Sequence, residues 1–226
     1  GSGCATLTSN TVNVTVVADP SLSAATRTNA VICSGGSSVF SSTLSNGTGT
    51  VTYQWQYSSD NTTWSNVVAG TPTGATYTNP TTTSMTIDGI SATGTYYYRL
   101  SATSTGSGCT TPVYSASASL QVVADPSAPT ATKSPADAIV CAGQTLTLTG
   151  VTDNGGGTGT CNIQYSHNGG AYSTTLTPFA ATVGTNTISI KKVCSGSGCD
   201  ESGVTTYTWT VVADPSLSAA TRTNSV

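Results

Sequence analysis

Apolar and polar residues alternate along many short segments of this chain. Two clear examples are segments 51–57 and 95–102, whose apolar side chains fall at every second position: Val51, Tyr53, Trp55 and Tyr57, then Tyr96, Tyr98, Leu100 and Ala102. A period of two is typical of β-strands. Turn-forming pairs such as Asn46-Gly47 and Asp60-Asn61 separate the segments. Short strands with turns every ~8–12 residues predict an all-β sandwich.

The second half of the chain repeats this pattern. Strands are predicted at 144–150, 161–166, 188–190 and 207–211, with a hairpin turn at 167–170. Charged residues make up only 7% of the chain, and Lys and Arg together number 6. So few basic residues cannot form a basic patch, which excludes nucleic-acid binding through phosphate neutralisation. No apolar run reaches the ~18 residues that a membrane-spanning helix needs.

A long repeat organises the chain. The segments 16–31 and 211–226 match at fifteen of sixteen positions, at an offset of 195 residues. The shared motif Val-Val-Ala-Asp-Pro occurs a third time at 122–126, and Gly-Ser-Gly-Cys precedes each copy, ending at Cys4, Cys109 and Cys199. Such a repeat is the signature of tandem domains. We interpret the chain as one two-domain period taken from a longer array.

The repeat predicts four segments. Residues 1–20 are the last strand of a preceding domain, 21–126 and 127–215 are complete domains, and 216–226 begin a following domain. Each linker contains an Asp-Pro pair: Asp19-Pro20, Asp125-Pro126 and Asp214-Pro215. Proline fixes φ and holds the preceding residue in an extended conformation. Because no Gly/Ser spacer follows, we expect the domains to lie end to end in a semi-rigid rod with nearest-neighbour contacts only.

The 7 cysteines indicate an oxidising compartment. The chain has no CxxC pair and a single histidine, His167, so a zinc site is not favoured. Disulfides are the better interpretation, and they place the protein outside the cytosol, at the cell surface or in the extracellular space. Because the count is odd, one cysteine has no partner here; we expect it to be Cys4, which would pair upstream.

Domain one resembles the immunoglobulin fold. Trp55 stands where strand C of that fold carries its core tryptophan, and 93–98 resembles the tyrosine corner, with Tyr96 as the corner tyrosine. Tyr98 stands where antibody domains have their second cysteine, so the inter-sheet disulfide of antibodies is absent. The resemblance instead places Cys33 before strand B and Cys109 after strand F, and we expect these two to be bridged.

Domain two resembles the hyalin-repeat class of immunoglobulin-like domains in the run Val183–Thr187, which leads into strand F. By analogy with domain one, Cys141 is expected to pair with Cys199. The remaining two, Cys161 and Cys194, would lie at the start of strand C and the end of strand F. These strands are antiparallel neighbours in such sandwiches, so we expect a second bridge there.

Residues with chemical potential are few and scattered. His167 is expected in an exposed hairpin turn, and among the acids only Asp200 and Glu201 are adjacent, so no catalytic pair is predicted and the chain is not expected to be an enzyme. Asp19, Asp125 and Asp214 recur at the linkers, but calcium wants six to eight oxygens, and an Asp that precedes Pro is the simpler interpretation. No cofactor or metal is expected. Trp64 and Tyr97 are the only plausible aromatic surface for a ligand such as a glycan.

The cysteine entry, the run YQWQYSSDNTTW and the TYYYRL strand of domain one resemble the immunoglobulin-like repeats of giant bacterial surface adhesins and filaments, including those that gliding bacteria export by type 9 secretion. This resemblance implies a structural stalk that holds a distal tip away from the cell, with neighbouring repeats of the same chain as partners. Two alternatives remain open: a repeat that itself binds glycan or another surface ligand, and a lateral packing unit in a fibre of several copies.

Overall fold

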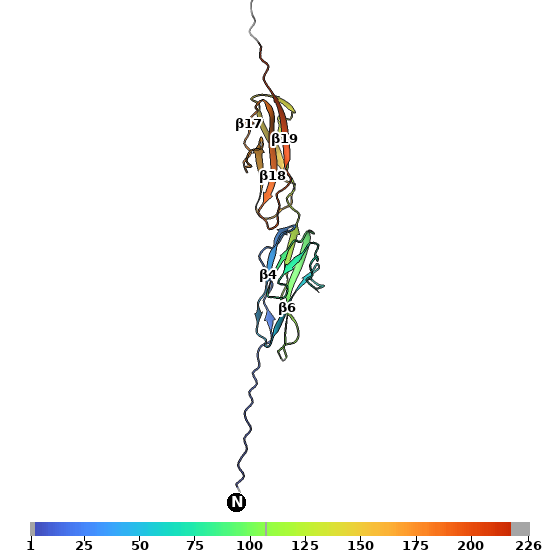
Figure 1. Ribbon diagram of the computed structural model, residues 1–226, viewed down its shortest axis with the longest axis vertical. Coiled ribbons are helices and arrows are strands. Elements are labelled where there is room, and N and C mark those ends of the chain that lie inside the picture. The colour runs from blue at the N-terminus through green and yellow to red at the C-terminus, as the bar shows by residue number, and fades with distance from the viewer. Residues whose placement is uncertain (1–2, 107, 218–226) are drawn as a thin grey trace, which may run out of the picture.

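The computed structural model describes residues 3–106 and 108–217, and within these ranges every regular element is a β-strand. The all-β prediction is therefore confirmed. The strands form two sandwiches, which follow one another along a single long axis (Figure 1). We call the sandwich that begins at β1 domain one and the sandwich that begins at β13 domain two.

Domain one contains two main sheets. One has the spatial order β3-β12-β10-β6-β7, with β11 also paired to β10, and the other has the order β2-β4-β9-β8. Their bounds are β3 Val31–Cys33, β12 Ala118–Val123, β10 Gly94–Ser104, β6 Val51–Ser58, β7 Ser65–Asn66 and β11 Val113–Tyr114, then β2 Thr26–Arg27, β4 Ser38–Ser41, β9 Ser84–Asp88 and β8 Thr76–Thr78. A short pair, β1 (Ser21–Leu22) with β5 (Leu44–Ser45), completes the domain.

Domain two is built in the same way with fewer strands. Its larger sheet has the order β14-β19-β18-β16 and its smaller sheet the order β13-β15-β17. The bounds are β14 Ile139–Cys141, β19 Thr205–Val212, β18 Gly184–Cys194 and β16 Cys161–His167, then β13 Thr130–Ser134, β15 Thr145–Thr152 and β17 Phe179–Ala180. In both domains the sheet that contains the last strand is the C-F-G sheet of an immunoglobulin-like sandwich, facing an A-B-E sheet.

The alternating pattern in the sequence accounts for both cores. In β10 the side chains of Tyr96, Tyr98, Leu100 and Ala102 are all buried, and the first three belong to one core cluster with Trp55 of β6 and Phe40 of β4. In domain two Trp209 is fully buried among Leu146, Ile188 and Ile190. Each sheet therefore turns one face inward, as a period of two requires.

The tyrosine corner is present in domain one, where the Tyr96 hydroxyl donates to the Ala92 carbonyl oxygen at 3.0 Å. Domain two has Asn186 at the corresponding place in β18. Its side-chain amide donates to the Thr182 carbonyl oxygen at 2.6 Å, and the residue is buried. Two different side chains thus fix the same corner, because each carries a donor that reaches back over four residues to the backbone.

The strand directions decide which residues meet at each end of a domain. In domain one β3 pairs with β12 in parallel, whereas β10 pairs with β12 antiparallel. Cys33, at the end of β3, therefore lies at the same end as Gly94, where β10 begins. Ser104, where β10 ends, lies at the opposite end. Domain two repeats this arrangement with β14, β19 and β18.

Candidate functional site at the interdomain junction

A disulfide joins the two domains. Cys33 of domain one is bonded to Cys199 of domain two, with their Cα atoms 4.9 Å apart although 166 residues separate them in the sequence. The expected pairs Cys33–Cys109 and Cys141–Cys199 are therefore wrong. Among the described residues Cys4, Cys109 and Cys141 have no disulfide partner.

The strand directions explain the correction in domain one. Cys109 follows β10 and so lies at the end of the sandwich opposite to Cys33. The 11 residues of β10 span roughly 37 Å at ~3.4 Å per residue, whereas a disulfide needs Cα atoms within ~4.4–6.8 Å of each other. A bridge between the two residues within one folded domain is geometrically impossible.

The same argument separates Cys141 from Cys199. Cys141 is paired with Val212 at the end of the sheet where β18 begins, and Cys199 follows the other end of β18. Each domain therefore has its two junction cysteines at opposite ends. The cysteine of the entry strand lies at the end that meets the following domain, and the cysteine of the Gly-Ser-Gly-Cys loop lies at the end that meets the preceding domain. The error came from treating each domain as a closed unit for disulfide pairing.

Backbone hydrogen bonds surround the Cys33–Cys199 bridge. The Cys33 amide donates to the Ser197 carbonyl oxygen at 2.9 Å. The Ser197 hydroxyl accepts from the Ser37 amide and donates to the Ser37 carbonyl oxygen, each at 3.0 Å. These contacts extend the backbone pairing of domain one into a loop of domain two. The junction is therefore held by hydrogen bonds as well as by the disulfide.

Two glycines allow this close approach. A Cβ atom on Gly36 would collide with the Ser197 carbonyl group, and a Cβ atom on Gly198 would collide with the backbone of Gly36. Because the obstructing atoms belong to backbone, they cannot move aside as a flexible side chain would. Glycine is required at both positions for the two loops to lie as close together as they do at this junction.

The linker itself is held by a loop of domain two. The Gly157 amide donates to the Ala124 carbonyl oxygen at 2.8 Å, and the Ser127 amide donates to the Gly155 carbonyl oxygen at 3.0 Å. Pro126, between these two contacts, is buried. The linker residues Asp125 and Pro126 thus lie against the 153–157 loop, and the limited bending of the linker stays a prediction.

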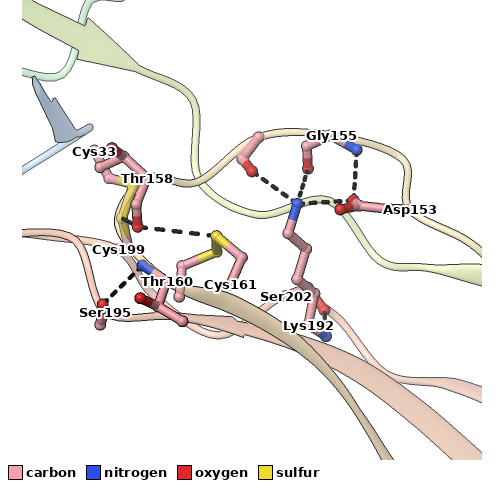
Figure 2. The surroundings of a disulfide bond; sticks show 12 residues. Cys33, Asp153, Gly155, Thr158, Thr160, Cys161, Lys192, Ser195, Cys199 and Ser202 are labelled. Atoms are coloured by element: carbon pink, nitrogen blue, oxygen red, sulfur yellow. Dashed lines mark hydrogen bonds and ion pairs between the residues drawn. A yellow bond between two sulfur atoms is a disulfide. The ribbon is translucent and has the colours of Figure 1, made fainter.

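A buried lysine fixes that loop. Lys192 is 4% exposed, and its Nζ donates to Asp153 Oδ1 at 2.7 Å and to the carbonyl oxygens of Gly155 and Gly156 at 3.3 and 2.9 Å (Figure 2). The lysine contact is the main cause that holds the pKa of Asp153 below its ordinary value, and the Gly155 amide, which also donates to this carboxylate, adds to the effect. Sequence analysis gave no role to Lys192, although it continues the inward positions of Ile188 and Ile190 in β18, because its partners lie in a loop that is distant in the sequence.

A second disulfide lies beside the first. Cys161 and Cys194 are bonded, as the resemblance to neighbouring C and F strands led us to expect, and they are directly paired residues of β16 and β18. The Thr158 carbonyl oxygen lies 3.9 Å from the sulfur of Cys161 and 3.7 Å from that of Cys199 (Figure 2). Both bridges therefore contact one loop, which concentrates covalent cross-links at the junction.

The aromatic residues considered for ligand binding lie elsewhere, on domain one. The guanidinium group of Arg99 stacks over the Trp64 ring at 4.3 Å and over the Tyr114 ring at 4.1 Å, and its Nε donates to Gln56 at 2.9 Å. The stacked guanidinium occupies a face of Trp64. Tyr97 lies in β10 opposite Ser58 and Ser119 and is half-buried. Neither Trp64 nor Tyr97 lines the cavities beside Cys109 or beside Cys141.

The remaining polar candidates are dispersed. His167 ends β16 and stacks on Phe179 with ring centroids 4.6 Å apart, so it is half-buried and not in an exposed turn as expected. The Asp60 carboxylate accepts from the amides of Thr62 and Thr63, which hold its pKa well below the ordinary value.

In the ranges that the structure describes, there is no group of three or more His, Cys, Asp or Glu residues placed to hold a metal ion. The same ranges contain no helix long and apolar enough to span a membrane.

The outer linkers were also named as sites. The Ala18 carbonyl oxygen, next to Asp19 and Pro20, accepts from the Gly47 amide at 3.2 Å. Asp214 and Pro215 follow β19 and are exposed. Residues 216–226, expected to begin another domain, lie almost entirely outside the described residues, which end at 217.

Comparisons with known proteins add the following. A family model described as "Domain of unknown function (DUF8696)" matches residues 23–124, that is, nearly all of domain one and less than half of the chain. No curated protein matches the chain. Because the solved structures that resemble it do so only distantly, the fold assignment rests on the strand order described above.

Three of these structures represent the group. The fibronectin(III)-like modules of Clostridium thermocellum CbhA share 15% identity over 84% of this chain and 94% of theirs, with a TM-score of 0.37. Murine CEACAM1b shares 10% over 87% of this chain and 100% of its own, with a TM-score of 0.34. The FN1–FN3 domains of chicken CNTN1 share 12% over 88% of this chain and 69% of theirs, with a TM-score of 0.33.

Proposed function

We propose that this chain is a structural spacer: a two-domain length of an extracellular stalk or surface filament, repeated along a longer protein. The observation that carries the proposal is the Cys33–Cys199 bond, which joins consecutive domains covalently at their ends. A ligand-binding module needs an accessible site, whereas a spacer needs a junction that resists bending and stretching. At the junction the disulfide is accompanied by backbone hydrogen bonds and by glycines that allow close contact between the two domains.

The bridge has a mechanical consequence. Tension applied to the two ends of the chain passes from Cys33 to Cys199 through the sulfur atoms, because this path is shorter than the polypeptide between them. The 166-residue interval includes nearly all of both domains, so tension bypasses it. A stalk built in this way keeps its length under load even where a domain unfolds.

Composition and redox chemistry support an extracellular place for such a stalk. Two disulfides in the described residues favour an oxidising compartment, since thiols stay reduced in the cytosol. The surface is rich in Thr and Ser, and only 7% of residues are charged. Few charged groups leave little basis for non-specific adsorption to polyelectrolytes, which suits a spacer whose neighbours are copies of its own repeat.

Small-angle X-ray scattering tests the proposal. The oxidised chain is expected to give the pair-distance distribution of two sandwiches in line, and Cys33→Ser/Cys199→Ser should broaden the distribution because the junction then bends. The control is Cys109→Ser/Cys141→Ser, which removes two cysteines away from this junction and should scatter as wild type does. A wild-type particle with its domains side by side would contradict a spacer function.

A further inference from the structure

We propose that the junction cysteines without partners are halves of further interdomain bridges, so that every junction of the array is bridged: Cys109 bonds the preceding domain-two-type repeat at its Cys141 position, and Cys141 bonds the following domain-one-type repeat at its Cys109 position. The inference deepens the proposed spacer function and rests on it for the existence of neighbouring repeats. It is supported by two similarities: the loop that carries Cys109 is similar to the loop that carries Cys199, and the strand that carries Cys141 is similar to the strand that carries Cys33.

The described residues of the loop that carries Cys109 make the same backbone hydrogen bond as their counterparts in the loop that carries Cys199. The Cys109 amide donates to the Gly106 carbonyl oxygen at 2.9 Å, and the Cys199 amide donates to the Gly196 carbonyl oxygen at 3.1 Å. Both cysteines end the sequence Gly-Ser-Gly-Cys, although Ser107 lies outside the described residues. Of these two cysteines, Cys199 is bridged to the neighbouring domain and Cys109 has no partner within the described residues.

Each of these loops rests on the same support. The sequence Gly-Thr-Gly-Thr occurs at 47–50 and at 157–160. The Gly106 amide donates to the Thr48 carbonyl oxygen at 3.0 Å, and the Gly196 amide donates to the Thr158 carbonyl oxygen at 2.9 Å. The supporting loops also hold the preceding linker alike, through the pairs Gly47 to Ala18 and Gly157 to Ala124. Domain one therefore has at its N-terminal end the same backbone pairing of loops and linker that domain two has at its junction with domain one.

Cys141 occupies the place of Cys33. In domain one Cys33 lies opposite Val123, the residue before the Ala-Asp-Pro linker, and in domain two Cys141 lies opposite Val212 in the same parallel register. The next amide donates to that valine in both domains, Ser34 to Val123 and Ala142 to Val212, each at 2.9 Å. Cys141 is exposed and without a disulfide partner. It therefore faces the position that a following Gly-Ser-Gly-Cys loop would take.

One position differs between the two junction types. Gln144 stands where Gly36 stands, and each donates its amide back to the entry cysteine, at 3.4 and 3.0 Å. A following loop cannot approach Gln144 as closely as Gly198 approaches Gly36. The bridge tolerates this, because disulfides span Cα separations of ~4.4–6.8 Å and the observed bridge, at 4.9 Å, lies near the lower limit.

Formation of each bridge is a thiol–disulfide exchange. An external disulfide such as glutathione disulfide accepts the electron pair: its S–S bond breaks to give two thiols, and the sulfurs of Cys109 and Cys141 from consecutive repeats form the new S–S bond. Atoms and electrons balance, and the two thiol protons pass to the reduced glutathione.

The test uses a two-period chain, in which the native 195-residue period is repeated once within the full sequence so that the Ala-Asp-Pro linker is kept. After oxidation with glutathione disulfide, we expect one new bridge between Cys141 of the first period and Cys109 of the second, identified by non-reducing peptide mass mapping. The two-period chain should then show the same 3 free thiols as the single-period chain. Two additional free thiols would overturn the proposal.

Matched variants assign the bridge. Cys109→Ser in the second period should release exactly one thiol from Cys141, whereas Cys109→Ser in the first period should leave the new bridge intact. A Cys109–Cys141 bond within a monomeric single-period chain would also overturn the proposal, because these residues lie at opposite ends of the rod. The number of free thiols does not depend on how stiff the junction is. A failure of the proposed bridge can therefore be told apart from a failure of the spacer function, which the scattering experiment tests.

Discussion

Lys192 and Asp153 form an ion pair at the junction, with 2.7 Å between Nζ and Oδ1, in which the lysine is almost fully buried and the carboxylate is half exposed. The lysine Nζ also donates hydrogen bonds to the carbonyl oxygens of Gly155 and Gly156. Lys192 and Asp153 together thus form a clamp that holds the loop against the interdomain linker.

The clamp predicts a pH dependence. Because the folded protein lowers the pKa of Asp153, its contribution to stability is complete above the unfolded value of ~3.9 and is lost as pH falls through the lower folded pKa. The Gly155 amide, which donates to this carboxylate at 2.9 Å, should report the titration by NMR. In Lys192→Met the apparent pKa should rise toward the ordinary value, and in Lys191→Met, whose lysine pairs with Glu201, it should not change.

Asp153→Asn tests the same pair at neutral pH. We expect a loss of about 1–2 kcal/mol in the free energy of unfolding of domain two, the value for a charged hydrogen bond reduced for the exposure of the carboxylate. Chemical denaturation followed by the NMR signal of the Trp209 indole N–H, which donates to Pro135 in the folded domain, measures it. An unchanged midpoint would show that the two carbonyl oxygens alone satisfy Lys192.

Gly36→Ala should weaken the junction without unfolding domain one. The added methyl group meets the Ser197 carbonyl group, and overpacking of this kind costs ~1–3 kcal/mol. Because ~1.4 kcal/mol corresponds to a tenfold change in an equilibrium constant, the equilibrium for Cys33–Cys199 formation against glutathione should fall roughly 5- to 150-fold. Gly203→Ala, whose new Cβ would have only an ordinary contact with Ala128, is the matched control and should leave that equilibrium unchanged.

The Cys161–Cys194 bridge should matter for the stability of domain two. It closes a 33-residue interval, for which the chain-entropy model gives roughly 3–4 kcal/mol. Cys161→Ser/Cys194→Ser is therefore expected to lower the midpoint of domain two in thermal unfolding while domain one is unaffected. Domain one has Val51 and Ser104 as the corresponding register pair and folds without such a bridge, so a variant that fails to fold at all would contradict this estimate.

The sequence predicted the strands and the cores well because alternation is a local signal. Tyr98, Leu100 and Trp209 were expected inside and are fully buried. The Cys161–Cys194 bridge could also be predicted from the sequence, because it depends only on which strands are neighbours in the sheet. Pairing of Cys33 is different, because it depends on which end of the sandwich each cysteine reaches.

Strand direction was the signal that could have corrected the pairing. An entry strand parallel to the last strand places Cys33 beside the linker exit, and an F strand antiparallel to it carries Cys109 to the other end. For Lys192 the local pattern indicates burial but not the partners, because Asp153, Gly155 and Gly156 are distant in the sequence. Alternation in β18 places Lys192 on the inward face after Ile188 and Ile190, whereas Lys191 lies on the other face, where its ammonium group stacks on Tyr172 and pairs with Glu201.

Single-molecule force extension of the chain, pulled from its two termini, tests the central claim most directly. In the oxidised chain the segment between Cys33 and Cys199 should contribute no length on unfolding. Reduction should release the 166-residue interval, which adds about 550–600 Å of contour length at ~3.3–3.6 Å per residue. An oxidised chain that extends as far as the reduced chain would contradict the account.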